Sequence, residues 1–243
     1  MAVSATNDSQ TVLSGSLTPG RHLLDNYRNL LANQDVWKAM SNSLVYSLSQ
    51  TLLALVICSF AGYGFEIFHT RNKDRLMSVL LLAMMVPLAA TMVPLFQMMS
   101  KMGFLNTAAG FVLPSVSTPF LIMMFRQSAR AFPHDIIEAA RIDGLGEIRI
   151  FLRMFFPTMR STYAAAMTIT FMNAWNNYLW PKVIMQTNDA MTMPMLTANL
   201  MSGYVVDYGM LMVAVLLSTL PTVVIFFLLQ KSFTEGIAGA VKG

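Results

Sequence analysis

Residues 39–65 read AMSNSLVYSLSQTLLALVICSFAGYGF and contain no Asp, Glu, Lys or Arg. Four further windows share this property, at 76–100, 102–125, 161–181 and 208–230, and all five are 21 residues or longer. A helix needs roughly 20 apolar residues to cross the hydrocarbon core of a bilayer. Because a backbone in lipid must satisfy its own hydrogen bonds, the windows predict transmembrane helices. They lack the alternating pattern of a membrane β-barrel.

The composition agrees with lipid as the solvent. Of the 243 residues, 55% are hydrophobic and only 12% are charged, about half the charged share of a soluble domain. This balance excludes a disordered chain, a disulfide scaffold and an ordinary soluble enzyme. We therefore predict an all-α polytopic membrane bundle. Its five spans are expected at about 41–66, 76–99, 106–126, 159–180 and 208–230.

The basic residues predict the orientation of the chain. Eleven of the sixteen Lys and Arg fall within 71–75, 126–160 and 231–242. Such residues are enriched on the cytoplasmic side of a membrane. The loop 127–157 and the C-terminal tail 231–243 should therefore be cytoplasmic, with the N-terminal segment 1–38 outside. The net charge of +4 is then a signal of topology rather than of nucleic-acid binding.

No sequence feature supports catalysis by this chain. It has no G-x-x-x-x-G-K-[ST] phosphate loop and no G-x-S-x-G elbow. His22, His69 and His134 are far apart and belong to no metal-binding motif. We predict no catalytic residue, no metal and no cofactor, and we expect Cys58 to be a small buried residue. The spans also lack charge away from their ends, which argues against a proton-driven carrier.

Half of the ten prolines fall inside predicted spans, namely Pro87, Pro94, Pro114, Pro119 and Pro221. Each removes one backbone hydrogen bond and favours a kink. Broken helices are common where a membrane protein opens a path. Kinks that neighbouring helices compensate are an equally good interpretation for any single proline.

Amides and indoles end the fourth window, in the stretch NAWNNYLWP at 173–181. Asn173, Asn176, Asn177 and Trp180 have the spacing i, i+3, i+4, i+7, which predicts one shared helix face. Amides bind hydroxyl groups and an indole stacks on the apolar face of a sugar ring. These four are our candidate translocation-path residues for a neutral polyol. The alternative, which does not exclude the first, is an interfacial aromatic belt with interhelical amide bonds.

The loop 127–157 contains a short amphipathic helix, within PHDIIEAARIDG at 133–144. Pro133 and Asp135 suit a helix start, and Gly144 suits a stop. A helix of about two turns is marginal alone, so it must gain stability by docking an apolar face. That face is predicted to consist of Ile136, Ile137 and Ala140. Packing on its own bundle is the simplest interpretation.

This loop resembles the EAA loop of permease subunits in binding-protein-dependent ABC importers. The resemblance rests on EAA at 138–140, glycine six positions after Glu138 and proline thirteen positions after that glycine. Asp143 and Phe151 are similar to the carbohydrate-uptake branch, which contains the maltose and glycerol-phosphate systems. WNNY at 175–178 with Pro181 and the ending GIAGAVKG at 236–243 are also similar to that branch. The ending resembles that of the second permease of such pairs. Leu145 stands where the family usually has a small residue, and we expect it to alter packing only.

The resemblance implies a permease that moves a mono- or oligosaccharide across the bacterial inner membrane by alternating access. The implied partners are a second homologous permease, a cytoplasmic ATPase dimer, a periplasmic or lipid-anchored sugar-binding protein and the sugar, with no nucleic acid. The external segment 182–207 would meet the binding protein. The ATPase contact would consist of Glu138, Ala139, Ala140, Asp143 and Gly144. Further ATPase contact would come from the C-terminal residues Gly236, Gly239 and Lys242.

The family pattern has six spans where this sequence shows five. Either the start lies downstream of the true one or the first span is absent. We favour a truncated start, with residues 1–38 following a missing span and 39–243 forming the transport fold. Three other functions stay open: import of a sugar phosphate or another polyol, an ion-coupled secondary carrier, and a membrane scaffold that does not transport.

Overall fold

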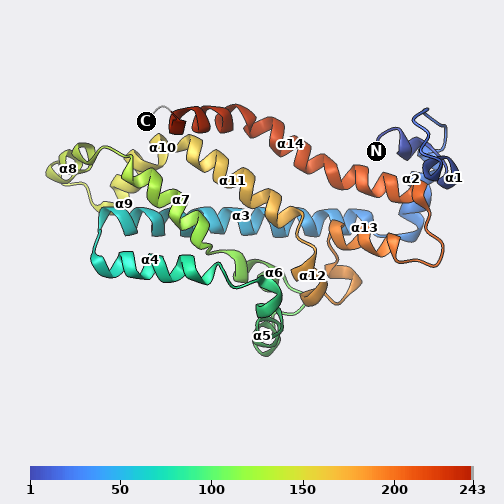
Figure 1. The fold of residues 1–243 in the computed structure, drawn as a ribbon, viewed down its shortest axis with the longest axis horizontal. Helices are drawn as coiled ribbons and strands as arrows, with labels where there is room; N and C mark the ends of the chain where they lie inside the picture. The colour runs from blue at the N-terminus through green and yellow to red at the C-terminus, as the bar shows by residue number, and fades with distance from the viewer. Residues whose placement is uncertain (242–243) are drawn as a thin grey trace. The chain divides into compact units, whose positions relative to one another are not determined.

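The computed structural model describes the backbone of residues 1–241 and the side chains through 228, with that of 230. This part of the chain is helical and contains no strand (Figure 1). In chain order the elements are η1 (Ser4–Thr6), α1 (Ser9–Leu13), α2 (Leu23–Asn33), α3 (Val36–Ile67), α4 (Arg71–Ala83), α5 (Leu88–Lys101), α6 (Ala108–Val112), η2 (Leu113–Ser115), α7 (Pro119–Arg130), α8 (His134–Ile142), α9 (Glu147–Ile150), the π-helix η3 (Phe151–Phe155), α10 (Phe156–Thr158), α11 (Arg160–Trp175), α12 (Leu179–Ile184), η4 (Asn188–Ala190), α13 (Met193–Met201) and α14 (Tyr208–Val241).

Two of these helices are long and apolar enough to cross a bilayer. They are α3, with 32 residues, and the stretch Tyr208–Leu228 of α14, with 21. The spans predicted near 41–66 and 208–230 are therefore continuous helices. Pro221 lies inside α14 without ending it, because a neighbouring helix can compensate for the one backbone bond that a proline removes.

Two predicted spans are each divided into two helices. The span 76–99 is divided between α4 and α5, which differ in direction by 101°, and the span 106–126 between Ala108–Ser115 and α7, which differ by 52°. Pro87 directly precedes α5 and Pro119 opens α7. The residue before a proline avoids helical geometry, as Thr118 does with its extended backbone, so neither preceding helix continues into the proline that follows it. If each bent pair is one crossing, the described residues contain four candidate spans.

The predicted span 159–180 is shorter than expected. The helix α11 has 16 residues, which at 1.5 Å per residue reach about 24 Å, less than the roughly 30 Å of a hydrocarbon core. It ends where Asn176 and Asn177 follow. The Asn176 side chain donates to the backbone oxygen of Met172 at 2.8 Å. Asparagine competes with helical bonding in this way and favours turns.

The chain divides into two compact units. The first comprises Met1–Leu48, Phe96–Phe111 and Met172–Phe226, and the second comprises Ser49–Leu95, Val112–Phe171 and the chain from Phe227 on. Within the first unit, polar bonds join α3 to the segment before α13. Asn42 Nδ2 donates to the backbone oxygens of Asp189 and Met191 at 2.7 and 2.9 Å, and Met193 N donates to Ser43 Oγ at 2.8 Å.

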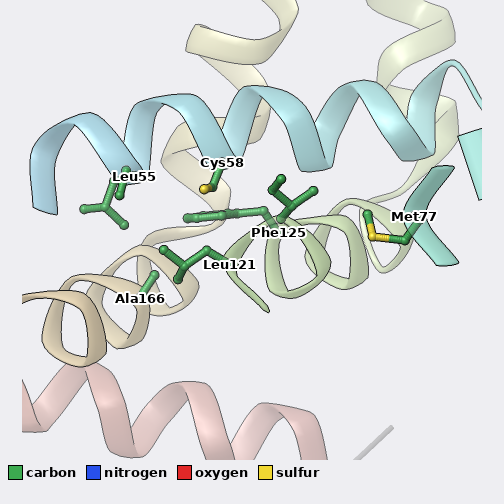
Figure 2. Packing of buried hydrophobic residues seen from close by; sticks show 8 residues of the cluster. Leu55, Cys58, Met77, Leu121, Phe125 and Ala166 are labelled. Carbon is green, nitrogen blue, oxygen red and sulfur yellow. The ribbon is translucent and has the colours of Figure 1, made fainter. Parts of the chain in front are cut away.

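The second unit has an apolar core between α3, α4, α7 and α11. Figure 2 shows Leu55 and Cys58 of α3 facing Leu121 and Phe125 of α7. Cys58 and Phe125 are fully buried, as expected for the cysteine. The buried cluster consists of Ala54, Leu55, Cys58, Met77, Leu121, Ile122, Phe125 and Ala166.

One cation joins three helices of this unit. The Arg126 side chain of α7, 11% exposed, reaches Glu66 of α3 at 3.0 Å and Asp74 of α4 at 2.6 Å. Arg130 also contacts Glu66, at 3.4 Å. A charge withdrawn from water is costly unless it is paired and hydrogen-bonded. The two carboxylates therefore allow Arg126 to lie against the core.

Gly62 generates the first prediction, because α3 packs tightly against α7 at this position. A Cβ there would lie 2.6 Å from the Phe125 Cβ and 2.7 Å from the Arg126 backbone nitrogen. Gly62→Ala should therefore separate the two helices and lower the melting temperature of the purified protein, by overpacking of about 1–3 kcal/mol. Gly64→Ala is the matched control, since nothing lies within 4 Å of its Cβ position. Equal melting temperatures would contradict this packing.

Candidate functional site

The EAA stretch lies in α8, which docks on its own unit through one face. Ile137 and Ala140 are 1% and 4% exposed and belong to a second buried cluster. The other buried members of this cluster are Tyr63, Ala129, Phe132, Ile150, Phe151 and Phe155. Ile136 was predicted on the same face but is 42% exposed. The docked face therefore consists of two residues rather than three.

The rest of α8 faces outward. Of the five residues expected to contact an ATPase, Glu138, Ala139, Asp143 and Gly144 are exposed. Ala140 is the exception, since it packs inside the cluster. Sequence reasoning missed Ile142, which is 87% exposed. This accessible apolar side chain lies beside the exposed residues of the EAA stretch.

Gly144 ends α8 through a bonding pattern that needs left-handed backbone. The Leu145 amide donates to the Ala140 oxygen and the Gly144 amide to the Arg141 oxygen, both at 3.0 Å. This pair of bonds is a Schellman motif, with Gly144 at φ +78°. The motif usually includes an apolar contact by the residue after the glycine. Leu145 supplies it by packing against the cluster that contains Ala140, so the departure at this position does affect packing.

An ion pair restrains the turn between α8 and α9. Arg141 Nε lies 2.8 Å from Glu147 Oε1, with both side chains about 40% exposed. The hydrogen bond that Arg141 donates to the Glu147 carboxylate raises the pKa of the Arg141 guanidinium. At this exposure the pair contributes little to stability. Its effect is to orient two side chains beside the exposed face of α8.

The four candidate translocation-path residues do not share a helix face, so that prediction was wrong. The helix α11 ends at Trp175, Asn176 and Asn177 lie between helices, and Trp180 belongs to α12. Trp180 is buried at 2% exposure and donates from Nε1 to the Gly110 oxygen at 3.0 Å. Its indole is thus committed to packing. Asn173 is exposed and Asn177 is half-buried.

Asn176 instead lines a polar groove in the first unit, with a volume of about 260 Å³. The lining residues are Asn176, Thr197, Val215, Ser218, Thr219 and Thr222. Trp175 Nε1 donates to the Ser218 oxygen at 3.0 Å and so holds the end of α11 against α14. Sequence reasoning missed the four hydroxyl residues. Three of them, Ser218, Thr219 and Thr222, could have been noticed in the sequence as polar residues near the middle of the apolar window 208–230.

The C-terminal contact residues cannot be placed in the same way. Lys242 lies outside the described residues. Gly236 and Gly239 fall within the backbone of α14, but their surroundings are also outside what the structure describes.

The sequence profile of the family described as "Binding-protein-dependent transport system inner membrane component" matches residues 54–239. The chain belongs to this family. It is therefore a multi-pass inner-membrane permease subunit and is not itself catalytic.

Three relatives are similar in sequence to this permease over nearly all of its length. It is 43% identical to the lactose transport system permease protein LacG of Rhizobium radiobacter, over 100% of this chain and 89% of the relative. It is 33% identical to the arabinooligosaccharides transport system permease protein AraQ of Bacillus subtilis, over 96% and 89%. It is 30% identical to the sn-glycerol-3-phosphate transport system permease protein UgpE of Escherichia coli, over 99% and 89%.

Two solved structures share the fold of the permease. A chain of a bacterial ABC transporter involved in the import of alginate superposes with a TM-score of 0.85 at 18% identity, covering 96% of this chain and 88% of that one. A chain of the MetNI methionine ABC transporter superposes with a TM-score of 0.61 at 15% identity, covering 83% and 94%. The permease therefore has the all-helical fold of ABC importer membrane subunits.

The cap of α8 gives a second prediction. Gly144→Ser places a side chain in left-handed backbone, which costs about 1–2 kcal/mol. Amide hydrogen exchange over residues 134–145 should therefore become roughly five- to thirtyfold faster. Gly146→Ser is the control, because Gly146 has φ −75° and ψ 155° at the start of α9, where serine is a favoured cap. Equal exchange in both variants would show that the left-handed geometry does not stabilise α8.

Proposed function

We propose that this permease imports a sugar, a mono- or oligosaccharide, by alternating access, using ATP hydrolysed by a separate subunit. Family membership and the similarity to LacG and AraQ support the substrate class. The geometry of α8 supports its proposed role in coupling to the ATPase. Ile137 and Ala140 dock the helix on the buried cluster, while the other residues of the EAA stretch are exposed. The similarity to UgpE keeps a sugar phosphate or another polyol as the second candidate.

The proposed assembly contains four kinds of subunit or ligand. A second homologous permease completes the pathway, an ATPase dimer binds the cytoplasmic side, and a periplasmic or lipid-anchored binding protein delivers the sugar. The family description supports a binding-protein-dependent system. The segment 182–207 would meet the binding protein, and the C-terminal tail 231–243 would lie along the ATPase.

In this assembly α8 acts as the coupling helix. Glu138, Ala139 and Asp143 contact the ATPase, and exposed Ile142 adds apolar area to the same contact. Gly144 ends the helix at the contact, and Ala140 acts indirectly by holding α8 on its cluster. Movement of the ATPase would then reach α3, because Tyr63 of α3 belongs to the cluster beneath α8.

The proposed topology has the N-terminus outside and the C-terminus inside. This orientation requires an odd number of crossings. The helices α3 and α14 and each of the two bent helix pairs count as one crossing, which makes four. The helix α11 contributes to the proposed fifth crossing. The distribution of Lys and Arg in the sequence supports this orientation.

Charge reversal on α8 tests the coupling role. Glu138→Arg should lower ATP-dependent sugar uptake by about tenfold or more, the effect of roughly 1.4 kcal/mol at a contact. It should also abolish stimulation of the ATPase by the binding protein. The measurement is uptake into liposomes that contain the complete transporter. Asp25→Arg reverses an exposed charge on α2 and should leave both activities unchanged. Unchanged uptake in Glu138→Arg would show that α8 is not the coupling helix.

Cysteine labelling in intact cells tests the topology. The native Cys58 is buried, so single exposed cysteines can be introduced without a competing site. A membrane-impermeant maleimide should label Asp189→Cys from outside and should label Arg149→Cys only after the membrane is permeabilised. The reverse pattern would overturn the proposed orientation.

A further inference from the structure

The polar groove of the first unit lies beside the middle of an apolar helix. Ser218 and Thr219 are at the centre of the membrane-length stretch Tyr208–Leu228, and Thr222 follows one turn later. Polar side chains at such a depth cost free energy unless they are hydrogen-bonded, and in membrane helices they commonly mark a substrate path. The groove is therefore a better candidate for a path than the face predicted from Asn173, Asn177 and Trp180, and it retains Asn176.

Several donors in the groove are already used within their own helices. Thr219 Oγ1 donates to the Val215 oxygen at 2.7 Å, and Thr197 Oγ1 donates to the Met193 oxygen at 3.1 Å. Asn176 Nδ2 donates to the Met172 oxygen at 2.8 Å. A hydroxyl oxygen that donates its proton still has lone pairs, and an amide keeps its carbonyl oxygen. The groove thus presents acceptors, which match the hydroxyl donors of a sugar.

The groove carries no charge. Its described lining contains no Asp, Glu, Lys, Arg or His. Phosphate and carboxylate groups are normally bound by Arg, Lys or backbone amides at helix starts. An anion in this groove would lose water without gaining a cation. The lining therefore favours an uncharged sugar over a sugar phosphate or an acidic saccharide.

The volume indicates a partial site. About 260 Å³ is below the roughly 300–1,000 Å³ of complete ligand pockets. The groove is also open rather than enclosed, so this chain alone does not surround a ligand there. The groove is thus of a size to hold part of an oligosaccharide rather than the whole.

From these observations we propose that the groove lined by Asn176, Thr197, Ser218, Thr219 and Thr222 is a subsite for an uncharged sugar ring. This inference rests on the proposed import function and narrows its substrate class. The hydroxyl and amide oxygens accept hydrogen bonds from the sugar, and the second permease closes the open side of the site.

Removal of one hydroxyl tests the subsite. The complete transporter in liposomes is assayed for ATP-dependent uptake of lactose, arabinooligosaccharides and glycerol 3-phosphate. Thr219→Val should lower uptake of the neutral sugar by about fivefold or more, the scale of one lost hydrogen bond. Thr170→Val is the matched control, because Thr170 makes the same kind of bond, to the Ala166 oxygen at 2.7 Å, in the second unit. It should leave uptake unchanged.

A labelling measurement covers the case in which Thr219→Val fails to assemble. In a Cys58→Ala background, a small maleimide should label Thr219→Cys in the complete transporter. The imported neutral sugar should slow this labelling about threefold or more at saturating binding, and glycerol 3-phosphate should not. Labelling of Ser14→Cys, at an exposed position outside the proposed contact surfaces, should not respond to either compound.

The outcomes separate the two proposals. Equal uptake in Thr219→Val and Thr170→Val overturns the subsite, as does labelling of Thr219→Cys that the imported sugar leaves unchanged. Uptake of glycerol 3-phosphate alone overturns the uncharged substrate class. Absence of ATP-dependent uptake of any of the three compounds by the unmodified transporter would instead contradict the import function itself, and this inference with it.

Discussion

The coupling role proposed for α8 depends on the buried cluster beneath it. A nine-residue helix is too short to be stable by its own backbone bonds. The structure gives α8 its support from Tyr63 of α3 and from Phe151 and Phe155 of the π-helix, whose rings lie 5.1 to 5.4 Å from one another. Close-packed interiors transmit displacement rather than absorb it. A movement of the exposed EAA face would therefore displace α3 and the end of α7 through this cluster.

The lipid environment explains the rest of the architecture. Because no water is present to hydrogen-bond the backbone, breaks in membrane helices occur where neighbouring protein can compensate. The break before Pro119 is partly covered by other parts of the chain, whereas residues 84–87 before α5 are exposed in this subunit. The charge of Arg126 is in turn compensated by Glu66 and Asp74. The two units both include parts of α3, α11 and α14. The buried cluster beneath α8 draws on α3, α7, α8, α9 and η3, whereas the polar groove is lined by the residue after α11 and by α13 and α14.

The chemistry of the groove bears on how related permeases divide their substrates. The relatives include systems named for neutral saccharides and one named for a phosphate ester, so the family fold does not select between them. Selection must come from side chains along the path. In this permease the described lining of the groove is polar and uncharged, which is the chemistry of hydroxyl recognition.

The sequence alone determined the properties that depend on local composition. Windows without charge report the solvent around a helix, so the membrane class and the α3 and α14 spans could be predicted. Pro133 and Gly144 marked the ends of α8 because capping is a local interaction. Tertiary structure decided where the other spans break, since Pro94 and Pro221 stay inside helices while Pro87 and Pro119 begin new ones. Tertiary structure also decided that Trp180 is buried and that Asn176, Thr197 and Ser218 line one groove. The groove depends on packing between helices that are far apart in sequence, as the bond from Trp175 to Ser218 illustrates.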